Sequence, residues 1–403
     1  MDRKKAIAFA IKIFPFALNI AIIDFLIPIK YDTILDRLPL LGLLVTVAWV
    51  ASNFLDFIVG YLTDHVGVRK ILQSGVIVCL AGSLLFAISD NITVMTIGVF
   101  LWGLSYIIMT VPSDAYVLSE FSKPYRGSAY GWLYFSQNIG YAIAPLLAYF
   151  FIIKFGMNIS ILIAALIAVI SFPLFSDVKS HSKKMSLFSG LKHAIFEKNM
   201  LKEILEDLGK MKFRQYSLLF NVFISSVWFI VVLIGSPLLF FHADSDLFHG
   251  ALLSFFFMLP LALVVIPYGR LANSQSRRRK MIVFGLLTGA VSLIIFYFIQ
   301  NLYFLFVSAS ITTILIYLGW SASEVEVSEH LPEGEKAEYM GIYASARDWG
   351  YDLAPLFYGL LASINLKLPF LVVGFLILLA GIISIFAQRT DHKIIKPTSP
   401  VVN

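Results

Sequence analysis

The chain has 403 residues, of which 59% are hydrophobic and only 14% are charged. Soluble globular proteins carry roughly a quarter charged residues, so this composition excludes an ordinary soluble protein. The net charge of +6 comes mostly from short basic segments between apolar runs, which argues against nucleic-acid binding. The single cysteine, Cys79, excludes an intramolecular disulfide and a cysteine-ligated metal cluster.

Long apolar runs recur from one end of the sequence to the other. About 20 apolar residues in a helix cross the ~30 Å hydrocarbon core of a bilayer. A closed β-barrel also satisfies its backbone in lipid, but the alternating strands that it needs are absent. We therefore predict an all-α membrane protein with twelve transmembrane helices. The twelve runs are residues 6–29, 38–61, 70–88, 92–117, 128–151, 157–176, 214–241, 249–271, 280–299, 302–328, 338–363 and 366–388.

The longest polar stretch, residues 177–213, divides the twelve runs six and six. We therefore expect an N-terminal bundle over residues 1–176, a cytoplasmic linker, a C-terminal bundle over 214–388 and a cytoplasmic tail over 389–403. Part of the linker has apolar residues at helical spacing among lysines, which predicts an amphipathic helix at the inner membrane surface. A solvated linker with accidental periodicity is the alternative. The apolar positions are Leu187, Leu191, Ile195, Leu201, Ile204, Leu205 and Leu208.

Basic residues predict the orientation of the chain in the membrane. If the N-terminus is inside, the inside segments hold 25 Lys and Arg residues and the outside loops hold four. Short cytoplasmic loops carry such an excess of Lys and Arg. We therefore expect a multi-pass protein of the cell membrane with both termini in the cytoplasm.

A loop between the second and third runs carries the pattern Gly-x-Leu-x-Asp-x-x-Gly-x-Arg-Lys over residues 60–70. A degenerate copy occupies residues 269–279, an offset of 209, with Asn273 in place of the aspartate. A second element, Gly140-Tyr141-x-x-Ala144-Pro145-Leu146, recurs at residues 350–356 with an offset of 210. Repeats in this sense predict two similar six-helix halves.

These motifs, together with Glu120-x-x-x-Pro124-x-Arg126-Gly127 before the fifth run, resemble the major facilitator superfamily of transporters. The resemblance implies two pseudo-symmetric bundles that rock around a central site, lined by the first, fourth, seventh and tenth helices. The Ala144-Pro145 element looks like one in the fifth helix of drug/proton antiporters, with Ala144 in place of the usual Gly. Val99 stands where proton-coupled members often have a basic residue.

In this family the loop signature acts as a gate on the cytoplasmic side. Asp64 would face the positive N-terminal end of the eleventh helix, which stabilises a carboxylate by ~0.3–1 kcal/mol. Gly60 and Gly67 would let backbones approach closely. The alternative is that the charges only orient the loop during insertion. The expected gate residues are Asp56, Gly60, Asp64, Gly67, Arg69, Glu120 and Arg126, with Arg69 and Arg126 clamping Glu120.

Charged residues within the runs are costly in lipid and face a cavity or a partner. Arg347, Asp348 and Asp352 lie in the middle of the eleventh run, and two carboxylates at i,i+4 suit proton uptake and release. A static ion pair to a neighbouring helix is the alternative. Asp24 is a further candidate, although snorkelling toward the outer surface also explains it. Three acids near the cytoplasm, for which we expect simple hydration, are Asp114, Glu324 and Glu326.

Polar and aromatic side chains in the runs predict an amphipathic cavity for an organic solute. Gln137 and Asn138 occupy the positions equivalent to Arg347 and Asp348. Trp102, Tyr106 and Trp320 are the expected aromatic contacts. The other candidates are Asn19, Ser105, Asn221, Ser225, Trp228 and Tyr317.

The sequence therefore predicts a secondary active transporter for a small cationic or neutral organic solute, coupled to protons. The expected partners are the solute, protons and the lipid bilayer, and we expect a monomer. No catalytic, nucleotide-binding or metal-binding motif is present, so we expect neither an enzyme nor a cofactor. A facilitative uniporter, and a non-transporting receptor or lipid-handling protein on the same scaffold, remain alternatives.

Overall fold

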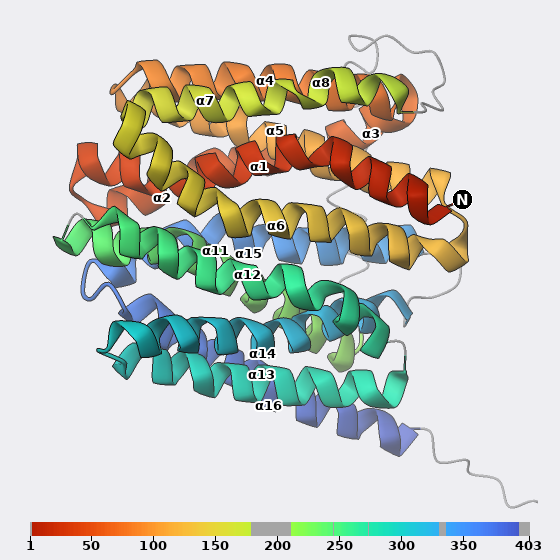
Figure 1. Ribbon diagram of the computed structural model, residues 1–403. Helices are drawn as coiled ribbons and strands as arrows, with labels where there is room; N and C mark the ends of the chain where they lie inside the picture. Colours follow the sequence, from red (N-terminus) through yellow and green to blue (C-terminus); the bar gives the residue numbers. More distant parts are fainter. Residues whose placement is uncertain (1, 179–210, 245, 273, 330–335, 395–403) are drawn as a thin grey trace, which may run out of the picture.

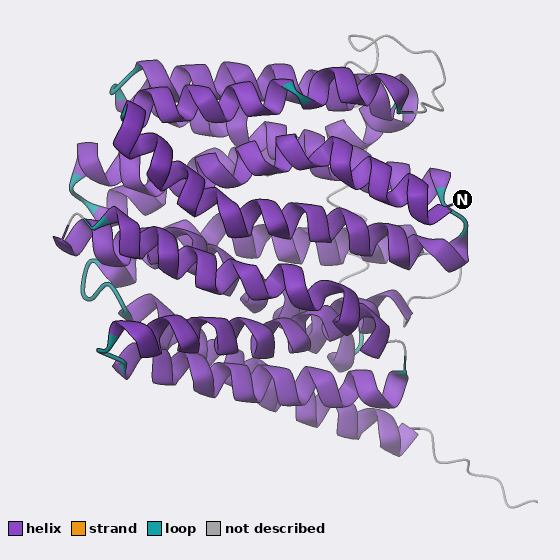
Figure 2. Ribbon diagram, in the orientation of Figure 1, coloured by secondary structure: helices purple, strands orange, loops and turns teal. Residues whose placement is uncertain are grey.

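The computed structural model describes residues 2–178, 211–244, 246–272, 274–329 and 336–394. Helices make up nearly all of these residues, and no strand occurs among them (Figure 2). The predicted amphipathic segment of the linker lies outside the described residues.

Twelve membrane-length segments run along the long axis of the bundle (Figure 1). Eleven of them combine the length and hydropathy of a membrane span, and the twelfth, α15, has similar length but carries Arg347, Asp348 and Asp352. The first six are α1 (Asp2–Leu35), α2 (Leu38–Asn53) with α3 (Asp56–Val66), α4 (Val68–Ile88), α5 (Ile92–Glu120), α6 (Lys123–Phe155), and α7 (Met157–Val169) with α8 (Ser171–Leu174) and η1 (Phe175–Asp177). The second six are α11 (Phe213–Asp244), α12 (Leu247–Leu271), α13 (Gln275–Phe298), α14 (Leu302–Glu329), α15 (Lys336–Ala362) and α16 (Leu368–Ile394).

The helices form two six-helix bundles with the same arrangement, so the predicted fold class is confirmed. Figure 1 shows α4 and α7 on one outer side and α13 and α16 on the other. Between them, α12 packs on α6, α15 packs on α2 and α1 packs on α11. These three contacts form the interface between the bundles.

Equivalent glycines allow close helix packing inside each of the two bundles. A Cβ on Gly140 of α6 would lie 3.4 Å from the Leu18 nitrogen in α1, and a Cβ on Gly350 of α15 would lie 3.3 Å from the Phe223 carbonyl carbon in α11. Each glycine therefore lets the fifth helix of its bundle pack closely on the first. The repeated Gly-Tyr-x-x-Ala-Pro element thus has one structural role in both halves.

Two helix boundaries differ from the sequence prediction. The first helix continues to Leu35, so Lys30 is buried in α1 and not in an outside loop. Its ammonium group donates to the carbonyls of Phe86, Ala87 and Ser89 at the end of α4, where the helix dipole favours a cation. The second span is also interrupted, by a turn at Phe54 and Leu55 between α2 and α3.

One end of the interface between the bundles is sealed. A Cβ on Gly42 of α2 would lie 2.9 Å from the Pro355 carbonyl carbon of α15, and a Cβ on Gly359 would lie 3.0 Å from the Leu38 carbonyl carbon. Thr46 Oγ1 accepts a 3.0 Å hydrogen bond from the Leu356 amide nitrogen. These contacts lie at the end opposite to the start of α1, so we call this end the seal.

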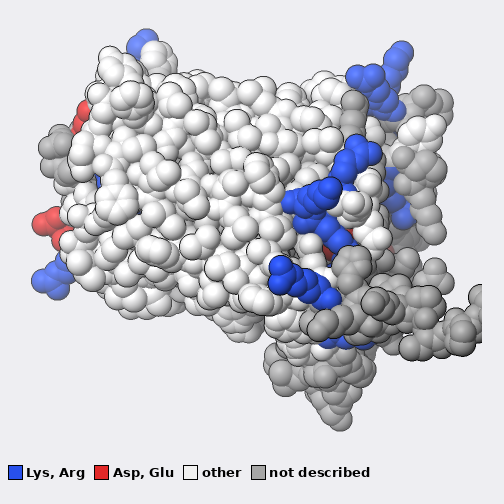
Figure 3. Space-filling view, turned by 90° about the horizontal axis from the view of Figure 1, so that it is seen from below, with Lys and Arg blue, Asp and Glu red and all other residues white. Residues whose placement is uncertain are grey.

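The other end of the molecule, where α1 begins and α16 ends, carries most of the visible basic side chains (Figure 3). His242 Nδ1 and Asp32 Oδ1, which are 2.8 Å apart, join α11 to α1 at the sealed end. The two ends of the bundle therefore differ in both charge and packing.

Candidate functional site

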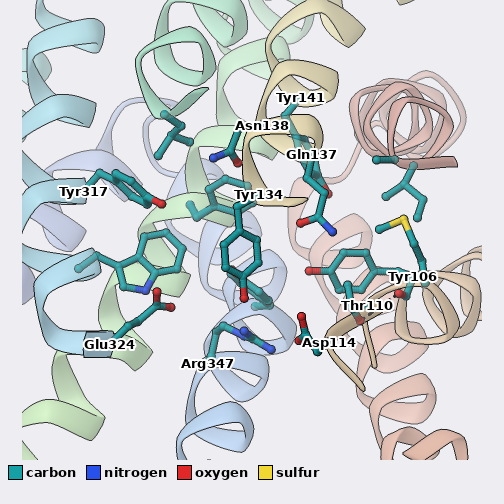
Figure 4. A pocket seen from close by; sticks show the side chains of 17 residues that line it. Tyr106, Thr110, Asp114, Tyr134, Gln137, Asn138, Tyr141, Tyr317, Glu324 and Arg347 are labelled. Atoms are coloured by element: carbon teal, nitrogen blue, oxygen red, sulfur yellow. Dashed lines mark hydrogen bonds between the residues drawn. The ribbon is translucent and has the colours of Figure 1, made fainter. Parts of the chain in front are cut away.

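A cavity of about 100 Å³ lies between the two bundles. It is partly open, and its lining reaches from the centre of the helices toward the end where α1 begins. Figure 4 shows the polar and aromatic side chains that point into it. The lining residues are Ala17, Ile20, Tyr106, Met109, Thr110, Asp114, Tyr134, Gln137, Asn138, Tyr141, Phe229, Leu261, Tyr317, Trp320, Glu324, Arg347 and Tyr351.

Single helical faces supply most of this lining. Tyr106, Thr110 and Asp114 follow one another at intervals of four along α5. Residues three or four apart share a helix face, so all three point the same way. The same spacing brings Tyr134, Gln137, Asn138 and Tyr141 together on α6, and Tyr317, Trp320 and Glu324 on α14.

Two acids and one base meet at the part of the cavity nearer the end of α5. Figure 4 shows the Arg347 guanidinium between the carboxylates of Asp114 and Glu324, which belong to opposite bundles. The Nε of Arg347 donates a 3.2 Å hydrogen bond to Asp348 Oδ1. Sequence analysis assigned Asp114 and Glu324 to simple hydration, whereas the structure places both in the cavity wall.

The cavity brings together Gln137, Asn138, Tyr106, Trp320 and Arg347, as predicted from the sequence. It also contains aromatic residues that sequence analysis did not single out as contacts. They are Tyr134, Tyr141, Phe229 and Tyr351.

Asp24 lies directly behind the cavity wall. Its carboxylate is buried and accepts a 2.9 Å hydrogen bond from the hydroxyl of Tyr141, which lines the cavity. If Asp24 snorkelled toward the outer surface, Lys30 would be the nearest cation in sequence. Lys30 instead binds the carbonyls at the end of α4. Snorkelling toward the outer surface is therefore not the explanation for Asp24.

Asp352 lies at the bundle interface and outside the cavity lining. Its Oδ2 accepts a 2.7 Å hydrogen bond from Asn53 Nδ2, which joins α15 to the last residue of α2. Asp348 and Asp352 therefore have different surroundings, because one contacts Arg347 and the other contacts the opposite bundle.

Several predicted cavity residues belong to the interior of a bundle. Trp102, a predicted solute contact, packs against Trp49 with ring centroids 6.1 Å apart and is not among the residues that line the cavity. The amide of Asn221 donates to Ser384, and Asn19 accepts from Cys79. The other buried polar or aromatic candidates that do not line the cavity are Ser105, Ser225 and Trp228.

The gate residues lie around α3 and the ends of α5 and α6. Asp64 and Arg69 are exposed on either side of Gly67, whose φ of 103° favours glycine. Asp56 begins α3, Glu120 ends α5, and Arg126 donates to the carbonyls of Leu118 and Phe121. A Cβ on Gly60 would meet only Val111 at 3.9 Å, so close backbone approach does not explain Gly60.

Glu326 occupies a buried ion cluster and is not hydrated as expected. Arg214, Arg278 and Arg279 form ion pairs with its carboxylate, which is 1% exposed. Glu324, only two residues away, lies on the cavity face of the same helix. The cluster thus ties α14 to the starts of α11 and α13 inside the C-terminal bundle.

We expect Glu326→Gln to lower the apparent melting temperature and the yield of folded protein strongly. Removing the carboxylate takes away a negative charge shared by the buried Arg214 and Arg278 and the partly buried Arg279, and breaking a buried pair costs ~3–5 kcal/mol. Thermal unfolding of purified protein measures the effect. Glu324→Gln, which faces the cavity, is the matched control, and equal losses in both variants would contradict a stabilising role for the cluster.

Among the described residues, no group of three or more His, Cys, Asp or Glu side chains is placed to hold a metal ion. The chemistry that the described lining offers is hydrogen bonding, ring stacking and charge.

Comparison with known proteins agrees with this architecture. The family pattern described as Major Facilitator Superfamily matches residues 9–247 and 218–401. The chain belongs to the Major Facilitator Superfamily. It is thus a multi-pass membrane transporter by family, and each of its two bundles corresponds to one half of the superfamily fold.

Individual relatives are distant. A putative niacin/nicotinamide transporter, NiaP, of Bacillus subtilis (strain 168) is 25% identical over 382 residues, which is 90% of each chain. The structure of the human organic anion transporter MFSD10 has a TM-score of 0.67 at 13% identity and covers 94% of this chain and 99% of its own. The proton:xylose symporter XylE has a TM-score of 0.70 at 14% identity, covering 98% and 96%. At these identities the solved structures establish the fold alone.

Proposed function

We propose that the protein is a secondary active transporter that moves a small cationic or neutral organic solute by alternating access. The observation that carries this proposal is the cavity between the bundles, which lies on one side of a tight seal. Rocking of two bundles around such a cavity exposes it to each side of the membrane in turn. An open cavity also favours transport over a receptor whose centre is filled.

The size and lining of the cavity support a small ring-containing solute. Its volume of about 100 Å³ is below the ~300–1,000 Å³ of sites for drug-sized ligands. Aromatic rings provide stacking surfaces, and Gln137 and Asn138 provide amide groups for hydrogen bonds. The likeness to a putative niacin/nicotinamide transporter makes pyridine derivatives the first solutes to test.

We propose proton coupling, with Asp348 and Asp352 as the first candidate sites and Asp24 as the next. Asp352 joins the bundles through Asn53, and Asp24 contacts the cavity wall through Tyr141. A proton taken up at Asp352 would change a hydrogen bond between the bundles, and a proton taken up at Asp24 would change a hydrogen bond to the cavity wall. The resemblance of the Ala144-Pro145 element to drug/proton antiporters favours this kind of coupling.

We further propose that the protein acts as a monomer in the cell membrane, with both termini in the cytoplasm. The basic side chains at the end where α1 begins support this orientation, because cytoplasmic loops carry the excess of Lys and Arg (Figure 3). The cavity then opens toward the cytoplasm and the seal faces outside.

We expect Asp64→Asn to slow net transport several-fold and to leave solute affinity within about tenfold. Asp64 is exposed in the last turn of α3. In the proposed gate its carboxylate faces the N-terminal end of α15, an interaction that contributes only ~0.3–1 kcal/mol, enough to bias a conformational equilibrium but not to determine the fold. Initial transport rates and equilibrium binding, measured on equal amounts of protein, test this. Unchanged rates would count against a gating role.

The proposed function is tested by reconstitution into proteoliposomes. Ligands are first selected by thermal shift, and uptake of the selected solute is then measured with and without a pH gradient. We expect accumulation that depends on the gradient. Uptake that only equilibrates the solute would indicate a uniporter, and binding without flux would indicate a receptor.

A further inference from the structure

Five aromatic side chains form a cage around one part of the cavity. The Tyr317 and Trp320 rings are 5.9 Å apart at 80°, and the Trp320 and Phe229 rings are 6.1 Å apart at 67°. Phe229 in turn meets Tyr141 at 5.6 Å and 78°, and Tyr351 at 5.8 Å. The rings come from α6, α11, α14 and α15, so both bundles contribute. All five residues line the cavity, and Phe229 contacts three of the other four rings.

The cage contains a tryptophan N–H beside a carboxylate. Trp320 is 6% exposed and lines the cavity. Its indole N–H is the side-chain hydrogen-bond partner of Glu324, in keeping with the rule that buried polar groups in folded proteins are nearly always paired. This contact holds the Glu324 carboxylate beside the aromatic rings.

Charges around the cage favour a positive ligand. Glu324 and Asp114 line the same cavity, and Asp56 and Asp348 act electrostatically on Asp114. Among the described residues that line the cavity, Arg347 is the one basic side chain, and it already pairs with Asp348. Four acidic side chains therefore lie around a single guanidinium, so acidic groups outnumber basic groups at the cavity.

We propose that the cage binds the positively charged group of a small organic cation. This inference rests on the proposed transport function and narrows its solute class from cationic or neutral to cationic. Aromatic faces attract desolvated cations, and Glu324 supplies a counter-charge beside the rings. An anion would instead meet two acids, Asp114 and Glu324, and a guanidinium that already pairs with Asp348.

The test uses three solutes with the same pyridine ring and different charges. They are nicotinate, which is negative, nicotinamide, which is neutral, and 1-methylnicotinamide, which is positive. Binding to the purified full chain is measured by isothermal titration calorimetry. We expect the cation to bind about tenfold more tightly than the neutral amide, and the anion to bind most weakly.

Three variants separate the cage from general packing. Glu324→Gln should weaken binding of the cation about tenfold and change binding of nicotinamide less than about twofold. Trp320→Leu should weaken the cation similarly, whereas Trp320→Phe, which keeps a π-face, should retain part of the affinity. Asp36→Asn, an exposed acid outside the cavity, is the control.

Equal or tighter binding of nicotinamide or nicotinate would overturn the inference, as would equal weakening of all three solutes by Glu324→Gln. Binding of none of the three by well-folded protein would also overturn it. If the cation binds as expected but is not transported in proteoliposomes, the inference about the cage is supported and the proposed transport function is contradicted.

Discussion

Gly42→Leu should abolish net transport while leaving the protein folded. In the sealed conformation even a Cβ at this position would lie 2.9 Å from the Pro355 carbonyl carbon, closer than real Cβ atoms approach backbone. The clash is between bundles, so the core of each bundle is untouched. A side chain of four carbons would hold α2 and α15 apart and prevent the seal from forming. We expect flux below about 1% of wild type, because the transport cycle requires the sealed state.

Gly127→Ala is the matched control, because a Cβ on this exposed glycine would meet no atom within 4 Å. It should transport like the wild type. Gly359→Leu should reproduce the loss, since its Cβ would approach the Leu38 carbonyl carbon at the same crossing. Normal flux in well-folded Gly42→Leu would show that the seal is not part of the cycle.

Asp352→Asn should abolish pH-driven transport and preserve exchange of solute for solute. Asp352 accepts a hydrogen bond from Asn53 across the bundle interface, so its protonation is linked to whether α2 and α15 are in contact. Exchange needs no net proton movement and should survive. Parallel flux assays, one driven by a pH gradient and one by solute on both sides, measure the difference.

Asn53→Ala removes the same hydrogen bond but keeps the carboxylate, and it should change the rate without removing the response to pH. Arg347→Ala should reduce the folded yield more than Asp352→Asn or Asn53→Ala, because it leaves Asp348 without its cation in the membrane. Joint loss of yield and of both kinds of flux in every variant would favour a static ion pair. Intact pH-driven flux in both Asp352→Asn and Asp348→Asn would indicate that the proton binds elsewhere, with Asp24 as the next candidate.

The number and type of helices could be predicted because lipid imposes one strong rule. A span needs about 20 apolar residues, and ten of the twelve predicted runs each correspond to one helix, whereas the second and the sixth each correspond to consecutive shorter helices. The end of α1 could not be placed, because Lys30 marks a boundary on hydropathy and yet is buried against the carbonyls that end α4. The turn at Phe54 and Leu55 also has no marker such as glycine or proline.

The site was only partly predictable, because charge alone does not indicate which face of a helix meets the cavity. Glu324 and Glu326 are two residues apart, yet one lines the cavity and the other lies in a buried cluster with three arginines. Helical spacing would have separated them, since Glu324 continues the face of Tyr317 and Trp320. The pairing of Asp352 with Asn53 depends on contact between bundles, which no local pattern in the sequence reports.

The most direct test of alternating access is a pair of spin-label distances between the bundles. Labels at the exposed positions Arg37 and Ser363 report on the sealed end, and labels at the exposed positions Ser119 and Ser276 report on the other. Cys79 is buried and should not be labelled. When solute and a pH gradient are applied, we predict that the first distance lengthens as the second shortens. Two distances that stay fixed, or that lengthen together, would contradict the account.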